Sequence, residues 1–174
     1  MFVLFDTETT GLERCSEIIQ IACNTQCGSR QFSKYLLSDE KNISDSASRA
    51  NGLSIQYRDG QKVLVKDGHT LETLSQRAGL IAFCDFIRRE QLSRQVVLVA
   101  HNGNSFDFQI LFNALKRYEL LDNFFSLHVM LVDSLSYCTR DKTKECPIEL
   151  LPEQVCFRVV RIPIQGTIQS TRRA

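Results

Sequence analysis

The pattern of apolar and polar positions predicts β-strands in the first part of the chain. Residues 1–5 form an apolar run that is typical of a buried strand. Two further β-rich runs, at residues 17–23 and 30–36, are separated by the turn-prone segment 26–29. We therefore predict a β-hairpin that lies beside the first strand.

The pattern is least regular between residues 38 and 68. This region is rich in Ser, Asp, Asn and Gly and has only scattered apolar positions. Such a composition predicts a long connection, with one short helix near residues 44–51. Gly52, Gly60 and Gly68 are isolated in this region, and we interpret them as turn positions.

Helical spacing of apolar residues begins after Thr70 and continues to Ile87, which predicts a long amphipathic helix. Thr70 could cap this helix, with Thr73 at the third position. The continuous apolar run at residues 95–100 then predicts a strand that is buried on both faces.

The next segment predicts a second helix and a last strand. Ser105 could cap a helix that carries Phe106, Ile110 and Leu111, and residues 129–133 predict a further buried strand. The resulting order, three strands and then alternating helices and strands, favours an α/β sandwich with a mixed sheet.

Length and composition favour one domain. The chain has 174 residues, of which 43% are hydrophobic, enough for a single substantial core. We place this domain at residues 1–153 and leave residues 154–174 as a basic tail, because that segment lacks helical periodicity. The net charge of +1, from 21 basic and 20 acidic residues, does not indicate a partner.

The cysteines indicate a reducing environment. Seven cysteines, an odd number without a preceding signal peptide, favour free thiols in an intracellular protein. Cys23 and Cys27 have C-x3-C spacing, but no second pair follows at a spacing typical of zinc sites. No apolar run approaches the roughly 20 residues that cross a bilayer, so we expect no membrane partner.

Two carboxylates follow the first strand directly. Asp6 and Glu8 are two positions apart, so in a strand their side chains point to the same side. Like charges this close raise each other's pKa unless a cation neutralises them, and hard oxygen ligands suit Mg²⁺ or Mn²⁺. We predict a divalent metal site, although acids at a strand end are more often ordinary turn residues.

Residues 5–12 and 101–107 resemble the first two motifs of the DnaQ-like, or DEDD, 3′-to-5′ exonucleases. This resemblance covers the chain to about residue 135. It implies a ribonuclease H-like fold, a three-layer sandwich with a mixed five-stranded sheet. Residues 18–22, 51–53 and 132–135 are most similar to the exonuclease-like domain of the promyelocytic leukaemia protein and its relatives, which implies a nuclear location.

The resemblance also implies a catalytic site. Asp6, Glu8 and Asp107 would be the catalytic carboxylates and would hold two Mg²⁺ or Mn²⁺ ions, with Asp6 bridging both. Two such ions stabilise the attacking and the leaving oxygen during phosphodiester hydrolysis. Taken alone, Asp107 would more often be interpreted as a helix cap. The expected partner is the 3′ end of single-stranded DNA or RNA, and the sequence does not distinguish the two.

The same resemblance implies substrate-binding residues. Leu12 matches the position whose apolar side chain packs against the terminal base, and we also assign Thr7 and Asn102 to substrate binding. His101 and Asn102 are expected to brace their loop. A small-molecule α/β enzyme has little support, because the chain has no phosphate-binding glycine-rich loop or nucleophile motif.

The third motif of the family, usually His-x4-Asp on a late helix, is not recognisable in this chain. The one match in spacing is His128 with Asp133, but residues five apart in a strand face opposite sides. We interpret them as strand-entry and strand-exit residues, and we expect the C-terminal helices to be missing or altered, as in a truncated or alternatively ended form. The leading prediction is a metal-dependent 3′-to-5′ exonuclease; the alternative is a weak or inactive exonuclease-like module that binds nucleic acid or protein partners.

Overall fold

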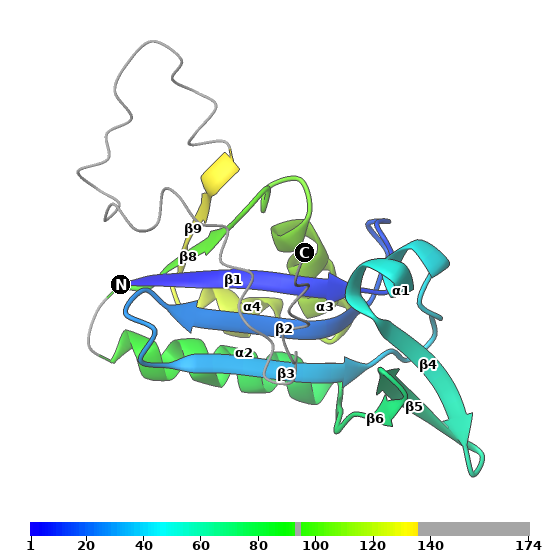
Figure 1. Ribbon diagram of the computed structural model, residues 1–174. Helices are drawn as coiled ribbons and strands as arrows, with labels where there is room; N and C mark the ends of the chain where they lie inside the picture. The colour runs from blue at the N-terminus through cyan, green and yellow to red at the C-terminus, as the bar shows by residue number, and fades with distance from the viewer. Residues whose placement is uncertain (93–94, 136–174) are drawn as a thin grey trace.

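The computed structural model describes residues 1–92 and 95–135, and its centre is a mixed sheet (Figure 1). In sheet order, the strands are β7 (Leu74–Ser75), β3 (Gln31–Leu37), β2 (Ile18–Thr25), β1 (Phe2–Thr9), β8 (Val97–Ala100) and β9 (Met130–Asp133). β2 pairs antiparallel with β1 and β3, whereas β8 pairs parallel with β1 and β9. The predicted mixed sheet is confirmed, and the two-residue strand β7 extends it at one edge.

Three helices pack on one face of the sheet: α2 (Gln76–Gln91), α3 (Asp107–Arg117) and α4 (Leu121–Phe125). Phenylalanine rings fill the space between these helices and the sheet. Phe83 on α2 is fully buried, and its ring centroid lies 5.5 Å from that of Phe5 and 6.2 Å from those of Phe32 and Phe124. The expectation that the C-terminal helices are missing or altered, and the predicted tail, concern residues outside the described ones.

The predicted connection contains more regular structure than its composition suggested. The short helix is confirmed as α1 (Asp45–Asn51), which Ser44 caps by accepting from the backbone N–H of Ala47. It is followed by a second, antiparallel sheet of β4 (Leu53–Arg58), β5 (Gln61–Lys66) and β6 (His69–Thr70). The expectation of a long connection beyond the helix was therefore wrong. The sheet turns at Asp59-Gly60 and Asp67-Gly68, both with positive φ, which is a strong hairpin signal in a sequence.

Both long helices begin later than predicted. Thr70 belongs to β6, and α2 is capped by Ser75, whose Oγ accepts from the N–H of Ala78 at 3.3 Å. Ser105 does not cap α3 either, because the N-cap position is Phe106 and no side chain caps it. Ser and Thr favour helix caps, but a sequence with several of them does not show which one the helix uses.

An ion pair between buried Glu17 and partly exposed Arg117 joins the end of the sheet to α3. Glu17 is buried directly before β2, and its Oε1 accepts from Nη1 of Arg117 at 2.8 Å. Its Oε2 accepts from the backbone N–H of Lys41 at 3.1 Å, which ties the connection after β3 to the same carboxylate. Glu17 and Arg117 also line an open cleft of about 310 Å³ beside α3.

Candidate active site

Strand β1 brings the two predicted carboxylates to one side of the sheet. Val3, Phe5 and Thr7 are buried, whereas Asp6 is exposed and Glu8 is half-buried. This alternation is the one expected of a strand with one face on the helices. Asp6 and Glu8 therefore share one face, as predicted, and the structure shows that this face is opposite to the helical layer.

Asp107 reaches β1 from the first turn of α3. Its Oδ1 accepts hydrogen bonds from the backbone N–H of Thr7 at 3.1 Å and from the Thr7 hydroxyl at 2.7 Å. The pairing between β1 and β8 ends at Leu4 and Val99, so the N–H of Thr7 lies beyond the paired region. The carboxylate of Asp107 takes the place of a β8 carbonyl there, which puts it beside the strand that carries Asp6 and Glu8.

A further carboxylate lies close to Asp107. Asp133 ends β9, opposite Ala100 of β8, and is only 7% exposed. Its Oδ2 accepts from the N–H of Asn104 at 3.0 Å and its Oδ1 from the N–H of Leu135 at 2.9 Å. Burial raises the pKa of Asp107 above its ordinary value, the charge of Asp133 raises it further, and the hydrogen bonds from Thr7 oppose both effects. Asp133, interpreted from sequence as a simple strand-exit residue, thus belongs to the acidic end of the sheet.

The chemistry of these residues suits a hard divalent cation such as Mg²⁺ or Mn²⁺, because Asp6 and Glu8 offer carboxylate oxygens from one face. Thr7 holds Oδ1 of Asp107, so Asp107 could offer only its other oxygen to an ion. Within the part of the chain that the structure describes, no three His, Cys, Asp or Glu side chains form a group that could hold a metal. The carboxylate side chains are the type of ligand that such an ion prefers. That Asp6, Glu8 and Asp107 together form the ligand set stays a prediction.

The residues predicted to bind substrate have three different surroundings. Leu12 is 83% exposed, as a side chain that packs against a base requires. Asn102 is exposed in the loop after β8, with a φ of 58°. Thr7 is buried and bonded to Asp107, so its side chain points away from the face that carries Asp6 and Glu8.

The three histidines lie in separate places. His101 follows β8, and its Nδ1 lies 3.2 Å from Oγ of Ser134. His128 is exposed at the entry to β9, where its Nδ1 lies 2.8 Å from the carbonyl oxygen of Ser126. His69 is exposed on β6, in the second sheet. His128 and Asp133 are at opposite ends of β9, as their interpretation as strand-entry and strand-exit residues required.

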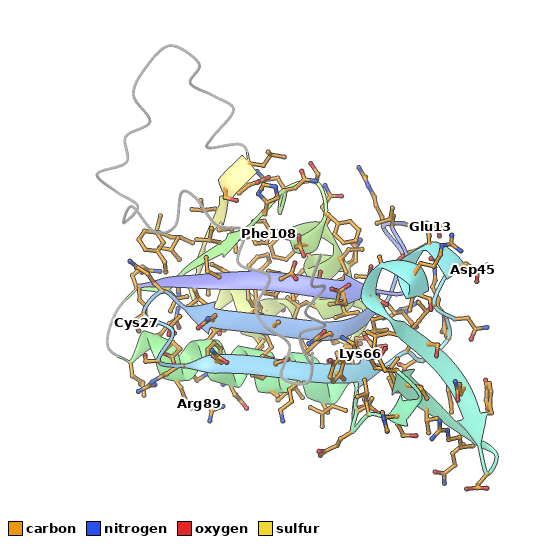
Figure 2. All side chains as sticks on the ribbon, in the orientation of Figure 1. Glu13, Cys27, Asp45, Lys66, Arg89 and Phe108 are labelled. Carbon is orange, nitrogen blue, oxygen red and sulfur yellow. The ribbon has the colours of Figure 1, made fainter. Side chains whose placement is uncertain are left out.

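The described cysteines, Cys15, Cys23, Cys27 and Cys84, are free thiols, as predicted. Cys27 is exposed at the turn between β2 and β3 (Figure 2), and hydrogen bonding, mainly from Ser29, lowers its pKa to about 7. Burial raises the pKa of Cys84 to about 11 and that of Cys23 well above its ordinary value. Because the thiolate is the nucleophile, these differences predict one preferred site of alkylation.

Among the four described cysteines, we expect iodoacetamide to label Cys27 first, at a rate that rises with pH and reaches half its maximum at about pH 7. Peptide mass spectrometry after short exposures would measure the order of labelling. Cys27→Ser is the control, since it should remove the fast phase. Faster labelling of Cys15, which is also exposed, would contradict this expectation.

No helix of residues 1–92 and 95–135 is long and apolar enough to span a bilayer. This finding agrees with the absence of a long apolar run in the sequence.

Known structures share this fold. Escherichia coli exonuclease I bound to a dT13 oligonucleotide matches with a TM-score of 0.58 and 13% identity, over 83% of this chain and 31% of that one. A metal-free complex of the same enzyme with single-stranded DNA gives 0.57 and 14%, over 77% and 28%. A zinc-bound form gives 0.58 and 13%, over 83% and 31%. The chain spans less than a third of these proteins, and at this identity the likeness shows a ribonuclease H-like, exonuclease-type fold.

Comparison with sequence families agrees with the structural likeness. The family model of the Exuperantia RNase H-like domain matches residues 1–149. No curated protein matches the chain.

Proposed function

This chain belongs to the Exuperantia RNase H-like domain family, and on that premise we propose that it is a metal-dependent 3′-to-5′ exonuclease of single-stranded nucleic acid. One observation carries the proposal: Asp6 and Glu8 share one face at the end of β1, and Asp107 is hydrogen-bonded to Thr7, the residue between them in the sequence. The fold shared with exonuclease I supports the same conclusion.

The proposed site divides its work among these residues. Asp6, Glu8 and Asp107 would hold Mg²⁺ or Mn²⁺, which when bound supplies charge stabilisation for phosphodiester hydrolysis and lowers the pKa of an attacking water. Thr7 fixes the position of Asp107 through two hydrogen bonds. Leu12, exposed in the loop after β1, offers an apolar surface to the terminal base.

A second candidate function is a weak or inactive exonuclease-like module that binds nucleic acid or protein partners. It is favoured by the separation of the three carboxylates, which within the described ranges do not form one metal-binding group. The unrecognised third motif agrees with this candidate. In either case we propose an intracellular, nuclear location, supported by the free thiols and by the resemblance to the promyelocytic leukaemia protein domain.

The test is digestion of 5′-labelled single-stranded DNA and RNA with Mg²⁺, with Mn²⁺, or with EDTA. We expect a ladder of products shortened from the 3′ end only when a metal is present. Asp6→Asn should reduce the rate at least about 100-fold, because it removes a ligand from charge stabilisation worth several kcal/mol. Asp122→Asn, on the exposed surface of α4, is the matched control and should cleave normally.

The second candidate makes the opposite predictions. Folded wild-type protein that leaves both substrates intact with either metal would overturn the exonuclease proposal. Retention of an oligonucleotide by both the wild type and Asp6→Asn, measured by fluorescence anisotropy, would then identify a binding module.

A further inference from the structure

One exposed thiol of this protein lies directly against a lysine. The Nζ of Lys41 is 2.8 Å from the Sγ of Cys15, although the two residues are 26 positions apart in the sequence. The proposed exonuclease site uses neither residue. A sulfenic acid, the first product of cysteine oxidation, condenses with a nearby nitrogen to form a sulfur–nitrogen bond. The contact therefore places a reactive partner beside the sulfur before any oxidation has occurred.

The backbone around Lys41 is held in place by hydrogen bonds on both sides of the residue. Its N–H donates to Oε2 of Glu17 at 3.1 Å, and its carbonyl oxygen accepts from Oγ of Ser38 at 2.7 Å. Glu17 is buried and follows Cys15 by two positions. The same carboxylate thus links the segment that carries the thiol to the segment that carries the amine. The contact does not depend on a chance meeting of two free side chains.

The charges around the pair keep the amine protonated while the thiol is reduced. Oε2 of Glu13 accepts from the Sγ of Cys15 at 3.3 Å and lies 3.9 Å from the Nζ of Lys41. The hydrogen bond with Cys15 is the main cause that raises the pKa of Lys41, and burial opposes it. The charges of Cys15, Glu13 and Glu17 raise it further. Conversion of the sulfur to a neutral sulfenic acid removes the contribution of the thiolate and makes the amine easier to deprotonate.

Small oxidants have access to this sulfur. Cys15 is exposed and lines the open cleft of about 310 Å³ beside α3. Among the described cysteines, Cys27 is also exposed, and its Sγ is hydrogen-bonded to the hydroxyl groups of Thr25 and Ser29. Cys15 therefore differs from the other exposed thiol of the described ranges in having an amine in contact with its sulfur.

We propose that hydrogen peroxide converts Cys15 and Lys41 into a covalent cross-link. The sulfur of Cys15 first attacks one peroxide oxygen. The O–O bond breaks, an S–O bond forms and water leaves, so that the sulfur is oxidised by two electrons and the peroxide is reduced. Nζ of Lys41 loses one proton to solvent and attacks the same sulfur. An S–N bond forms, the S–O bond breaks, and the hydroxyl leaves as water with a second proton from the nitrogen. The product is a sulfenamide.

The contact distance favours this second step over further oxidation. Reacting atoms in a near-attack arrangement are about 3 to 3.5 Å apart. The amine of Lys41 is already within that distance of the sulfur of Cys15. A second peroxide would have to arrive from solvent to form the sulfinic acid, which is an irreversible product. Lys41 should therefore protect Cys15 from irreversible oxidation, and the cross-link should join the loop after β1 to the connection after β3.

Peptide mass spectrometry tests the cross-link directly. After brief treatment of the whole chain with hydrogen peroxide, alkylation and digestion with trypsin, we expect peptide 15–30 joined to peptide 35–49. Peptide 35–49 stays intact because trypsin does not cleave after a modified Lys41. The joined pair should weigh two hydrogen atoms less than the sum of the separate peptides. Dithiothreitol should separate the two peptides, whereas it does not reduce a sulfinic acid.

Lys41→Arg is the matched control, because the guanidinium keeps the positive charge but does not lose a proton in proteins. This variant should give no joined peptides. Its Cys15 should instead react with dimedone, a reagent for sulfenic acids, whereas Cys15 of the wild type should be protected. Cys27 is the internal standard and should react with dimedone equally in both proteins. Circular dichroism would verify that both are folded.

Two results would overturn the inference. The first is equal reaction of Cys15 with dimedone in the wild type and in Lys41→Arg, without joined peptides. The second is a joined pair in which the fragment ions assign the bond to Cys23 or Cys27, which peptide 15–30 also contains. Neither measurement involves nuclease activity, so this inference and the proposed function can fail independently.

Discussion

Replacing Asp107 with asparagine is expected to raise the stability of the protein at pH 7 while reducing nuclease activity at least about 100-fold. Burial and the charge of Asp133 raise the pKa of Asp107, which means that the folded state disfavours the ionised carboxylate. Asparagine has a similar shape, carries no charge, and can still accept both hydrogen bonds from Thr7. The same change removes a proposed metal ligand, so activity and stability should move in opposite directions.

The pH dependence of the effect follows from the direction of the pKa shift. Because the folded pKa of Asp107 is raised, the folded state binds the proton more tightly than the unfolded state. Wild-type stability therefore falls as pH rises from the ordinary aspartate pKa through the raised one. The Asp107→Asn variant does not lose stability in this way. In urea unfolding, the difference in free energy of unfolding between the variant and the wild type should therefore be larger at pH 7 than at about pH 4. An equal or smaller difference at pH 7 would contradict the argument, and Asp122→Asn provides the surface control.

Replacing Phe83 with alanine is expected to lower the free energy of unfolding by about 3 to 5 kcal/mol. Phe83 is fully buried, and its ring contacts Phe5 of β1, Phe32 of β3 and Phe124 of α4. Alanine would leave a cavity between the sheet and the helices. The three neighbouring rings belong to different strands and helices, so they cannot all shift to fill it. Since Phe5 directly precedes Asp6, the loss should also loosen the strand that carries the acids.

Urea unfolding followed by circular dichroism would measure this loss. Phe125→Ala is the matched control, because Phe125 is on α4 beside Phe124 but is largely exposed. Phe125→Ala should lower the free energy of unfolding much less than Phe83→Ala. Similar losses for the two variants would show that the core between sheet and helices is not organised around Phe83.

The sequence predicted the central sheet because buried strands carry dense apolar runs, but it did not predict the sheet of β4, β5 and β6. That sheet buries little apolar surface of its own. Its core is Leu53 and Leu64 packed on Ile19 of β2, and polar residues occupy most of the remaining positions. With so few buried positions, the alternation of a strand is hard to distinguish from an irregular polar segment. The two Asp-Gly turns were the more informative signal.

Only the part of the acidic site that depends on local backbone geometry could be predicted from the sequence. Asp6 and Glu8 follow from alternation along one strand, which the sequence shows directly. Asp133 depends on the parallel pairing of β8 with β9, which puts it opposite Ala100. No local pattern specifies which two strands will be neighbours or in what register. The contribution of Asp133 to the site was therefore visible only in three dimensions.

Two contacts at this end of the sheet join residues that are far apart along the chain. Thr7 and Asp107 are 100 residues apart, and so are Glu17 and Arg117. Closing loops of this length has a high entropic cost, so such contacts form after local hairpins and helices. During synthesis, Asp6 and Glu8 on β1 can therefore come close to Asp107 only after α3 has been synthesised. A growing chain would carry no assembled acidic site until α3 has been made and has packed against the sheet.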